Sequence, residues 1–161
     1  MGTPTVLRLQ PGDAAAAARW DAFVQHCPGA SFFHRAGWQT LLRQVFRHDT
    51  HYLYAQGPHG IEGVLPLAHV NSLLFGSALA SLPFAAHAGV AAASEAAAQA
   101  LESEAQALAQ QLGVAHLELR HVQPRHADWP TQHLYVTFRK ALLPTEEANL
   151  LAIPRKQRAM V

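Results

Sequence analysis

Eleven histidines are the residues of this chain best suited to bind a metal or to transfer a proton. His48 and His51 lie three positions apart, a spacing that on a helix would place both imidazoles on one face, where they could hold a metal ion. The residues between them, however, lie where a helical pattern changes to a strand pattern. His116, His121 and His126 follow one another at intervals of five, which matches no zinc motif. We therefore expect no dedicated metal site, and a histidine metal centre is kept only as a third hypothesis.

The only cysteine, Cys27, is expected on the apolar side of a helix, at its C-terminal end. A nucleophilic thiolate is usually stabilised by a helix N-terminus or a nearby cation, and neither is expected here. We therefore predict a small core residue. A lone cysteine also excludes an internal disulfide and suits the reducing cytoplasm, where we place the protein. The chain lacks the G-x-S-x-G elbow of serine hydrolases and the glycine-rich phosphate loops.

Two pairs of acidic residues could share acid–base work: Glu102 with Glu104, and Glu146 with Glu147. Both pairs fall on predicted helices. We expect the first pair on a solvated helix surface, and the second in a first helical turn, where acids complement the helix dipole.

The net charge of +1 gives no general attraction to nucleic acids or to membranes. Lysine and arginine are absent from His48 to Leu119. Close to the C-terminus, Arg155, Lys156 and Arg158 place three cations within four positions, which could bind a phosphate or diphosphate. A solubilising surface run is the other interpretation. No stretch has the roughly 20 mostly apolar residues that a membrane-spanning helix needs.

The hydrophobic periodicity predicts a mixed α/β (α+β) domain rather than a doubly wound sheet. Asp13 and Ser94 are expected to cap helices, and the loop 57–60 to join a hairpin. The expected elements are, in order, a strand at 5–9, a helix between Asp13 and Pro28, a helix at 35–46, strands at 50–56, 61–70, 73–75 and 78–82, a helix at 95–112, strands at 114–120 and 134–140, and a helix that begins after Thr145.

The first two helices each carry apolar residues at the spacing of a buried stripe. We expect both stripes to face the core, and Trp38 to be a core residue rather than a platform for substrate. The two stripes are Trp20, Phe23, Val24 and Cys27 in the first helix, and Trp38, Leu41, Leu42 and Val45 in the second.

Several short segments resemble FemAB-like proteins, and they span most of the chain. Residues 31–38, SFFHRAGW, resemble the S-F-F-x-x-x-x-W segment of that family. Residues 153–161, IPRKQRAMV, resemble a junction in the FemAB-related proteins associated with the exosortase/PEP-CTERM system of Gram-negative bacteria. The further matches, in the same order, are THYLYA at 50–55, IEGVLPL at 61–67, SLPF at 81–84, LELR at 117–120 and YVTFRK at 135–140.

This resemblance implies a GNAT-like (acyl-CoA N-acyltransferase) fold, a mixed sheet flanked by helices. Family members usually contain two such domains, so residues 1–152 are expected to form the first, and residues 153–161 a basic junction into a missing second domain. FemAB-type enzymes move an aminoacyl group from aminoacyl-tRNA onto the amine of a peptidoglycan precursor; the PEP-CTERM relatives are inferred to serve envelope or exopolysaccharide assembly. We therefore expect half of an acyl- or aminoacyltransferase, inactive alone. The alternative is a non-catalytic GNAT-like binding scaffold.

The resemblance also suggests binding residues, with departures from the family pattern. In the peptidoglycan enzymes a lysine after the tryptophan segment helps to hold the diphosphate of the precursor, but Thr40 and Leu42 stand at the corresponding positions. Arg35 and Arg43 are nearby substitutes. The candidate substrate-binding residues are thus Arg35, Trp38, Arg43, Arg155, Lys156 and Arg158.

The loop that many relatives write P-F-x-x-Y-G-G reads PFAAHAG here, at 83–89. His87 in this loop is the best candidate for a catalytic base. GNAT acetyltransferases also need a Q/R-x-x-G-x-G/A turn for the pyrophosphate of acetyl-CoA, and the sequence contains none. No cofactor is therefore expected on this chain: an acyl-CoA or aminoacyl-tRNA donor would belong to the full-length protein, and these residues themselves give no support for a tRNA partner.

Overall fold

A computed structural model describes residues 4–72, 76–132, 138, 140–158 and 160. Contacts group the chain into two units, Met1–Trp129 and Pro130–Val161, and each is described by itself. The predicted strand at 73–75 and most of the one at 134–140 lie outside the described residues. Of the helices in the described part, none is both long and apolar enough to cross a membrane. The prediction of a domain at 1–152 followed by a junction stays a prediction.

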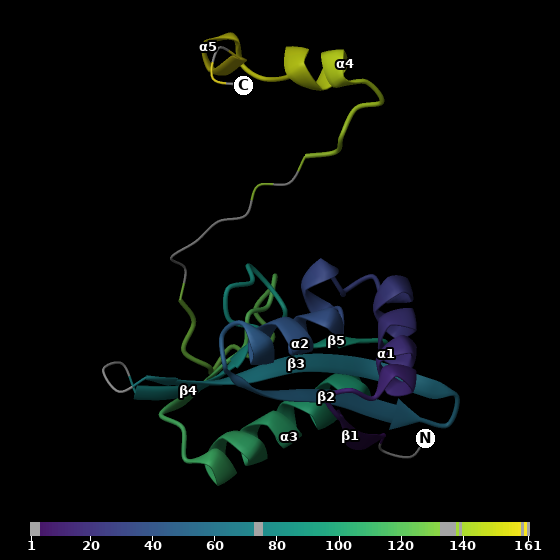
Figure 1. The fold of residues 1–161 in the computed structure, drawn as a ribbon, viewed down its shortest axis with the longest axis vertical. Coiled ribbons are helices and arrows are strands. Elements are labelled where there is room, and N and C mark those ends of the chain that lie inside the picture. The colour runs from purple at the N-terminus through teal and green to yellow at the C-terminus, as the bar shows by residue number, and fades with distance from the viewer. Residues whose placement is uncertain (1–3, 73–75, 133–137, 139, 159, 161) are drawn as a thin grey trace. The chain divides into compact units, whose positions relative to one another are not determined.

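A mixed sheet forms the centre of the first unit (Figure 1). Among the described residues its main path runs β1-β2-β3-β4-β6, and β5 pairs with β3 beside that path. All pairings are antiparallel except β4 with β6, which run parallel. The strands are β1 (Thr5–Leu9), β2 (Asp49–Gly57), β3 (Gly60–Ser72), β4 (Gly76–Ser81), β5 (Ala91–Ala92) and β6 (His116–Glu118).

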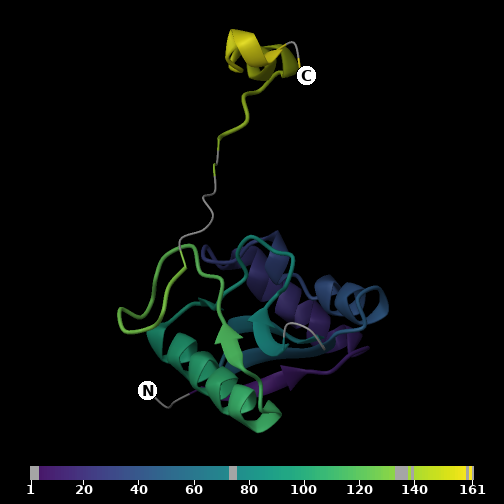
Figure 2. The ribbon, with the colours of Figure 1, turned by 90° about the vertical axis from the view of Figure 1, so that its left-hand side faces the viewer.

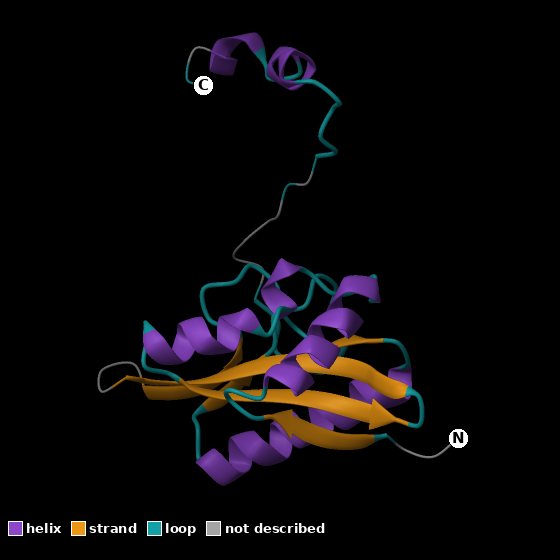
Figure 3. Cartoon of the chain, turned by 45° about the vertical axis from the view of Figure 1, so that its right-hand side comes forward, coloured by secondary structure: helices purple, strands orange, loops and turns teal. Residues whose placement is uncertain are grey.

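Helices cover both faces of this sheet (Figure 3). On one face, α1 (Ala14–His26), the 3₁₀ turn η1 (Phe32–His34) and α2 (Gly37–Gln44) pack over a core that includes Tyr52 and Val64. On the other face, α3 (Glu95–Leu112) packs over Leu53 and Leu67. The alternation of side chains along β2 and β3 supplies both cores. The expected mixed α/β architecture is therefore confirmed.

Helix α1 has the predicted start and the predicted buried stripe. The Asp13 carboxylate accepts from the Ala16 N–H at 2.9 Å, as an N-cap does. Trp20, Val24 and Cys27 are buried. Trp20 stacks on Tyr52 with ring centroids 5.3 Å apart, and its indole N–H donates to the His34 carbonyl at 2.6 Å. This bond ties α1 to η1.

Helix α3 also follows its prediction, including both ends. Ser94 accepts from the Ala97 N–H at 3.2 Å, and Gly113 ends the helix with a φ of 63°, a conformation that glycine adopts without strain. Small residues bring the helix close to the sheet: a Cβ on Gly63 of β3 would press against Leu101.

The predicted buried face of the second helix is wrong. Ser31 caps a separate 3₁₀ turn, so α2 begins only at Gly37. The Gln39 side chain donates to the Leu9 carbonyl at 3.1 Å, which satisfies its amide inside the protein and turns this face inward with Leu42. Leu41 and Val45 are consequently 38% and 66% exposed. Leu42 is the member of the predicted stripe that is fully buried, and Trp38 packs against the core while half-buried.

The Pro130–Val161 unit contains two short helices, α4 (Glu146–Leu151) and α5 (Arg155–Arg158). The Thr145 hydroxyl accepts from the Ala148 N–H at 3.2 Å, so the predicted helix start is confirmed. Pro154 stands between the two helices, where it cannot continue the first.

The position of α2 can be tested with one inward and one outward apolar residue. We expect Leu42→Ala to lower the free energy of unfolding by about 3 kcal/mol, because it leaves a cavity in the core. Val45→Ala removes an exposed side chain, and we expect a change within about 0.5 kcal/mol. Urea unfolding followed by circular dichroism measures both. Equal losses in the two variants would mean that the helix presents another face to the sheet.

Candidate functional site

The carboxyl ends of the parallel strands β4 and β6 form the candidate site (Figure 2). In open α/β sheets, ligands bind where neighbouring parallel strands end. The strand ladder stops at Ala80 and Glu118, and beyond it the Ser81 hydroxyl accepts from the Arg120 N–H at 2.7 Å. The loop 82–90 then leaves β4 before the chain returns to the sheet as β5. This second contact with the sheet, at Ala91–Ala92, was not predicted.

Arg120 holds the loop 82–90 with both its backbone and its side chain. Its carbonyl accepts from the N–H groups of Ala88 and Gly89, at 3.1 and 2.9 Å. Its guanidinium donates to the Ala85 carbonyl at 2.9 Å and to the Glu118 carboxylate at 2.6 Å. The loop is therefore bonded along its length to the segment that follows β6.

Two histidines complete the support of this loop. The His34 Nδ1 accepts from the Ser31 N–H at 3.0 Å, so Nε2 carries the proton and donates to the Gly89 carbonyl at 2.9 Å. The His121 Nε2 accepts from the Val90 N–H at 3.1 Å. A Cβ on Gly89 would overlap the His121 ring, so only glycine fits at that position. Both imidazoles act here as neutral groups.

Burial favours the neutral form of both rings. It lowers the pKa of His34 below its ordinary value of 6.5, although the backbone bonds to Gly89 and Ser31 act in the opposite direction. Burial likewise lowers the pKa of His121; Glu102 opposes the shift, and the positive charge of Arg125 adds to it. The loop is thus bonded by groups that can lose their bonding pattern in mild acid.

Glu102 is buried, so its expected place on a solvated helix surface is wrong. Its exposed fraction is 2%. It accepts from Arg125 Nε at 2.7 Å and lies 3.1 Å from His126 Nε2. A signal was present in the sequence, because Glu102 shares the helical face of Ala98, Leu101 and Ala105, all of which are buried.

Arg125 links the segment after β6 to two turns of α3. Besides Glu102, it donates from Nη2 to Glu95 at 2.9 Å. The hydrogen bond and charge of Glu102 raise the pKa of Arg125, so the guanidinium is firmly charged. His126 stacks on Trp129 with centroids 4.5 Å apart, which orders the same segment further.

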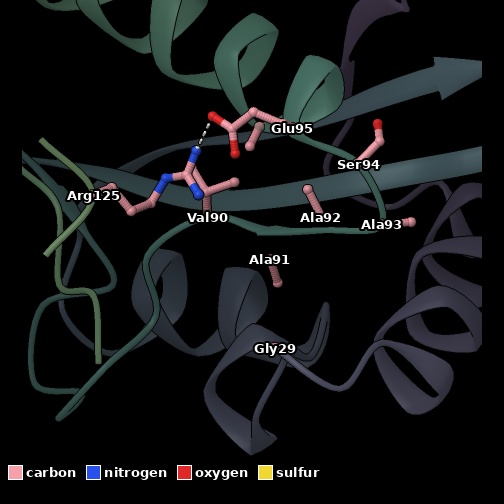
Figure 4. Close-up of a pocket in the computed structure, with 9 residues that line it drawn as sticks. Gly29, Val90, Ala91, Ala92, Ala93, Ser94, Glu95 and Arg125 are labelled. Carbon is pink, nitrogen blue, oxygen red and sulfur yellow. Dashed lines mark hydrogen bonds and ion pairs between the residues drawn. The ribbon is translucent and has the colours of Figure 1, made fainter. Parts of the chain in front are cut away.

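A pocket of about 330 Å³ opens beside this ion pair, at the start of α3 (Figure 4). One wall is the chain of small residues from Val90 to Ala93, and Gly29 lies across from them. Ser94, Ala98 and the Glu95–Arg125 pair complete the lining. The pocket therefore combines an apolar wall with one carboxylate and one guanidinium. The sequence analysis missed this pair.

Three of the predicted site residues lie near the start of α2. The half-buried Trp38 and His87 contact the same ring: the centroid of Phe33 lies 5.8 Å from that of Trp38 and 6.3 Å from that of His87. Arg35 is at the end of η1, 3.6 Å from the Asp21 carboxylate. The structure thus brings the candidate base and two candidate binding residues to one region of the unit.

The other predicted binding residues lie elsewhere. Arg43 is exposed in the last turn of α2. Arg155, Lys156 and Arg158 make up most of α5, and Arg158 donates to the carbonyls of Ile153 and Leu151, both at 2.8 Å. Their role in binding substrate stays a prediction.

A metal centre finds no support in the part of the chain that the structure describes, where no group of three or more His, Cys, Asp or Glu side chains could hold an ion. His51 is in β2, and His48 lies in the loop before it and stacks on Phe46 at 6.3 Å. The two histidines therefore do not share a helical face.

Solved acetyltransferase structures have the same fold. An aminoglycoside antibiotic 6'-N-acetyltransferase, AAC(6')-IG from Acinetobacter haemolyticus, matches with a TM-score of 0.52 and 14% identity, over 86% of this chain and 99% of that chain. A ribosomal-protein-alanine N-acetyltransferase from Brucella melitensis biovar Abortus 2308 matches with a TM-score of 0.51 and 16% identity, over 85% and 100%. A probable acetyltransferase matches with a TM-score of 0.51 and 10% identity, over 88% and 99%.

The chain therefore has a mixed α/β GNAT fold, in agreement with its sheet order and its flanking helices. At these identities the likeness concerns the fold alone. No protein-family model matches the sequence, and no curated protein matches it either.

The neutral histidines predict a loss of stability in mild acid. Folding lowers the pKa values of His34 and His121. Their contribution to the free energy of unfolding is therefore complete above pH 6.5 and is lost as the pH falls through the folded-state pKa values. We expect the free energy of unfolding to fall between pH 7.5 and 5.5, and to fall less in His121→Gln. His59→Gln, in the exposed hairpin turn, is the matched control. An NMR titration that gives either imidazole a pKa of 6.5 or higher would contradict the interpretation that folding favours its neutral form.

The buried carboxylate predicts a difference between neighbouring glutamates. We expect Glu102→Gln to lower the free energy of unfolding by about 3 kcal/mol, because it removes the charge that faces Arg125. Glu104→Gln, on the exposed side of the same helix, is expected to change it by less than about 0.5 kcal/mol. Thermal unfolding at pH 7 compares the two, and similar values would show that the Glu102–Arg125 pair contributes nothing.

Proposed function

We propose that this chain is the acceptor-binding, N-terminal half of a FemAB-like acyl- or aminoacyltransferase. Its acceptor would be an amine-bearing precursor of the cell envelope or of an exopolysaccharide. The GNAT fold and the resemblance of residues 31–38 and 153–161 support this proposal. The main support for the proposal is the pocket at the start of α3, because its lining suits an acceptor amine better than an acyl-CoA.

The polar wall of the pocket fits a ligand that holds both an amine and an acidic group. The Glu95 Oε1 accepts from Arg125 and from Gln99, at 2.9 and 3.2 Å, and Oε2 can accept from a ligand ammonium. Arg125 uses Nε and Nη2 on the two glutamates, so Nη1 can donate to a phosphate or carboxylate. Amino sugar phosphates and amino acids have this combination of charges.

The start of α3 is poorly suited to the diphosphate of acetyl-CoA. The chain enters the helix as Ala-Ala-Ala-Ser, without the glycine turn of acetyl-CoA-dependent GNAT enzymes. The Ser94 hydroxyl already accepts from the Ala97 N–H, and the Glu95 carboxylate would repel phosphate oxygens at the N-terminus of α3. We therefore place the donor, an acyl-CoA or an aminoacyl-tRNA, on a second domain beyond the basic residues 153–161.

Acyl transfer requires a neutral amine and a group that takes its proton. The ring nitrogens of His34 are both bonded to the backbone, and the Nε2 of His121 is bonded too. His87, in the segment PFAAHAG that resembles the family's P-F-x-x-Y-G-G loop, is kept as the proposed base. Trp38, Arg35 and the exposed Arg43 remain the proposed acceptor contacts, and Arg155, Lys156 and Arg158 the proposed diphosphate contacts.

A non-catalytic GNAT-like scaffold is the second candidate, and one observation favours it. The Ala88 and Gly89 N–H groups, which lie where β4 and β6 end, both donate to Arg120. A tetrahedral oxyanion at that point would need donors of this kind. For either function we propose a cytoplasmic location, which the single, buried Cys27 suits.

Binding by the 161-residue chain tests the proposal. We expect glucosamine 6-phosphate, an amine with a phosphate, to shift the NMR amide signals of residues 90–98 and 125 in a saturable manner. Glu95→Gln is expected to weaken binding about fivefold, as for the loss of one exposed ion pair, and Glu104→Gln to leave it unchanged. Acetyl-CoA is expected to cause no shifts there, and a thiol-release assay with this amine to give no turnover.

Shifts at residues 91–98 on adding acetyl-CoA, or release of its thiol, would overturn the proposed division between acceptor and donor. Absence of any shift with glucosamine 6-phosphate would remove the support that the pocket gives to an amine acceptor. Binding by this chain without turnover in a longer chain that carries the second domain would favour the scaffold.

A further inference from the structure

Exposed apolar side chains in the first unit are concentrated on the α2 segment and on the loop after β4. We use the name α2 ridge for Phe32, Trp38, Leu41, Val45, Phe46 and Phe84. Apart from the half-buried Trp38, these are exposed, by 71% for Phe32 and 63% for Phe84. Outside the ridge, the exposed large apolar side chains among the described residues of this unit are Leu7 and Val122. Clustered apolar exposure of this kind marks an interaction surface.

The aromatic end of the ridge is a stack of near-parallel rings. Phe46 and Phe84 lie 4.4 Å apart at 28°, and His48 stacks on both, at 6.3 Å from Phe46 and 6.2 Å from Phe84. Phe84 and Arg47 have φ values of 72° and 58°, which bulky residues rarely adopt. The backbone therefore holds this stack at the surface at a conformational cost, as is common at binding sites.

The helical part of the ridge is formed by α2, which precedes Phe46 in the chain. Trp38 and Leu41 of α2 and its C-cap residue Val45 occupy positions i, i+3 and i+7 and so lie on one side of the helix. Phe32 packs edge-on against Trp38, with centroids 5.7 Å apart. The Trp38 indole N–H donates to the Phe32 carbonyl at 3.2 Å, so the one polar group among the ridge side chains is already bonded.

The charged residues next to the ridge along the chain are mainly arginines, although the exposed Asp49 follows His48. Between Asp21 and Asp49 the sequence has no acidic residue, and the loop 82–90 has no charged residue apart from His87, which is charged only when protonated. Arg43 and Arg47 are exposed and flank Val45 and Phe46 along the chain, while Arg35 faces Asp21. Exposed rings flanked by arginines match the interface of an anionic bilayer, where rings enter the acyl boundary and guanidinium groups meet lipid phosphates.

We propose that the α2 ridge docks this protein on the surface of an anionic phospholipid bilayer. The exposed Arg43 and Arg47, which flank Val45 and Phe46 along the chain, complement lipid phosphates, and the ridge side chains between them are apolar apart from the bonded Trp38 indole. The net charge of +1 supplies no general attraction, so the local arginines and the exposed rings must provide the binding.

Sedimentation with vesicles tests this proposal on the 161-residue chain. We expect binding to vesicles of phosphatidylcholine with 30% phosphatidylglycerol, and at least tenfold weaker binding to phosphatidylcholine alone, on the order expected for several cationic contacts. Phe46→Ser with Phe84→Ser is expected to weaken binding about tenfold, and Arg43→Gln with Arg47→Asn also by about tenfold, with the latter effect lost in high salt. The matched controls, Val122→Ser and Arg19→Gln, lie outside the ridge and are expected to bind as the unchanged chain does.

Hydrogen exchange on the unchanged chain keeps the test independent of the folding of variants. We expect anionic vesicles to protect residues 32–48 and 82–88, and to leave 122–129 unaffected. No binding to these vesicles, or protection elsewhere only, would overturn the proposal. A doubled mass in solution that Phe46→Ser with Phe84→Ser abolishes, without vesicle binding, would assign the ridge to a second copy instead. Arg43 is also a proposed acceptor contact, whereas Phe46 and Phe84 are not, so the phenylalanine variant separates this outcome from the proposed acceptor.

Discussion

The loop between β4 and α3 depends on the backbone and side chain of Arg120 and on two histidines to satisfy its own backbone, and the candidate site depends on that loop. A strand would bond its N–H and C=O groups in a ladder, but here the chain leaves the sheet at Leu82 and rejoins it only at β5. Arg120, His34 and His121 supply the missing partners. The ring of His121 also leaves no space for a side chain at Gly89. The ends of β4 and β6, the pocket wall and His87 are positioned through these few bonds.

Local chemistry allowed much of this fold to be predicted. The caps at Asp13 and Ser94, the hairpin turn and the stripe of α1 are each determined by residues close in sequence, and the structure confirms them. The face of α2 was not predictable in this way. Gln39 is buried only because the Leu9 carbonyl, 30 positions away, accepts from its amide. Glu102 is a similar case, since its partners Arg125 and His126 come from the segment between the strands expected at 114–120 and 134–140, where the sequence has no helix or strand pattern.

The fold and the local chemistry of the site give different information about function. The GNAT architecture is shared with acetyltransferases, yet one fold supports many activities. The function therefore has to be inferred from the residues of the site. Here the first turn of α3 carries Glu95, bonded to Arg125, at the place where a helix N-terminus would otherwise favour an anion. The candidate residues near Trp38 and His87 come from η1, α2 and the loop 82–90, which pack on the α1 side of the sheet, and the pocket reaches that side through Gly29 and Ala91.

The parallel pairing of β4 with β6 has a consequence for the order in which the domain folds. The strands β2, β3 and β4 pair as neighbours along the chain, whereas β1 pairs with β2 across both α1 and α2, and Ser81 and Arg120 are bonded across 39 positions. Contacts between distant segments form slowly, because the entropy of closing the intervening chain is lost before the contact stabilises anything. α3 lies within that interval and shortens it once helical. We therefore expect β2, β3, β4 and α3 to assemble before β1 and β6 join the sheet, so that the polar network around Arg120 forms late in folding.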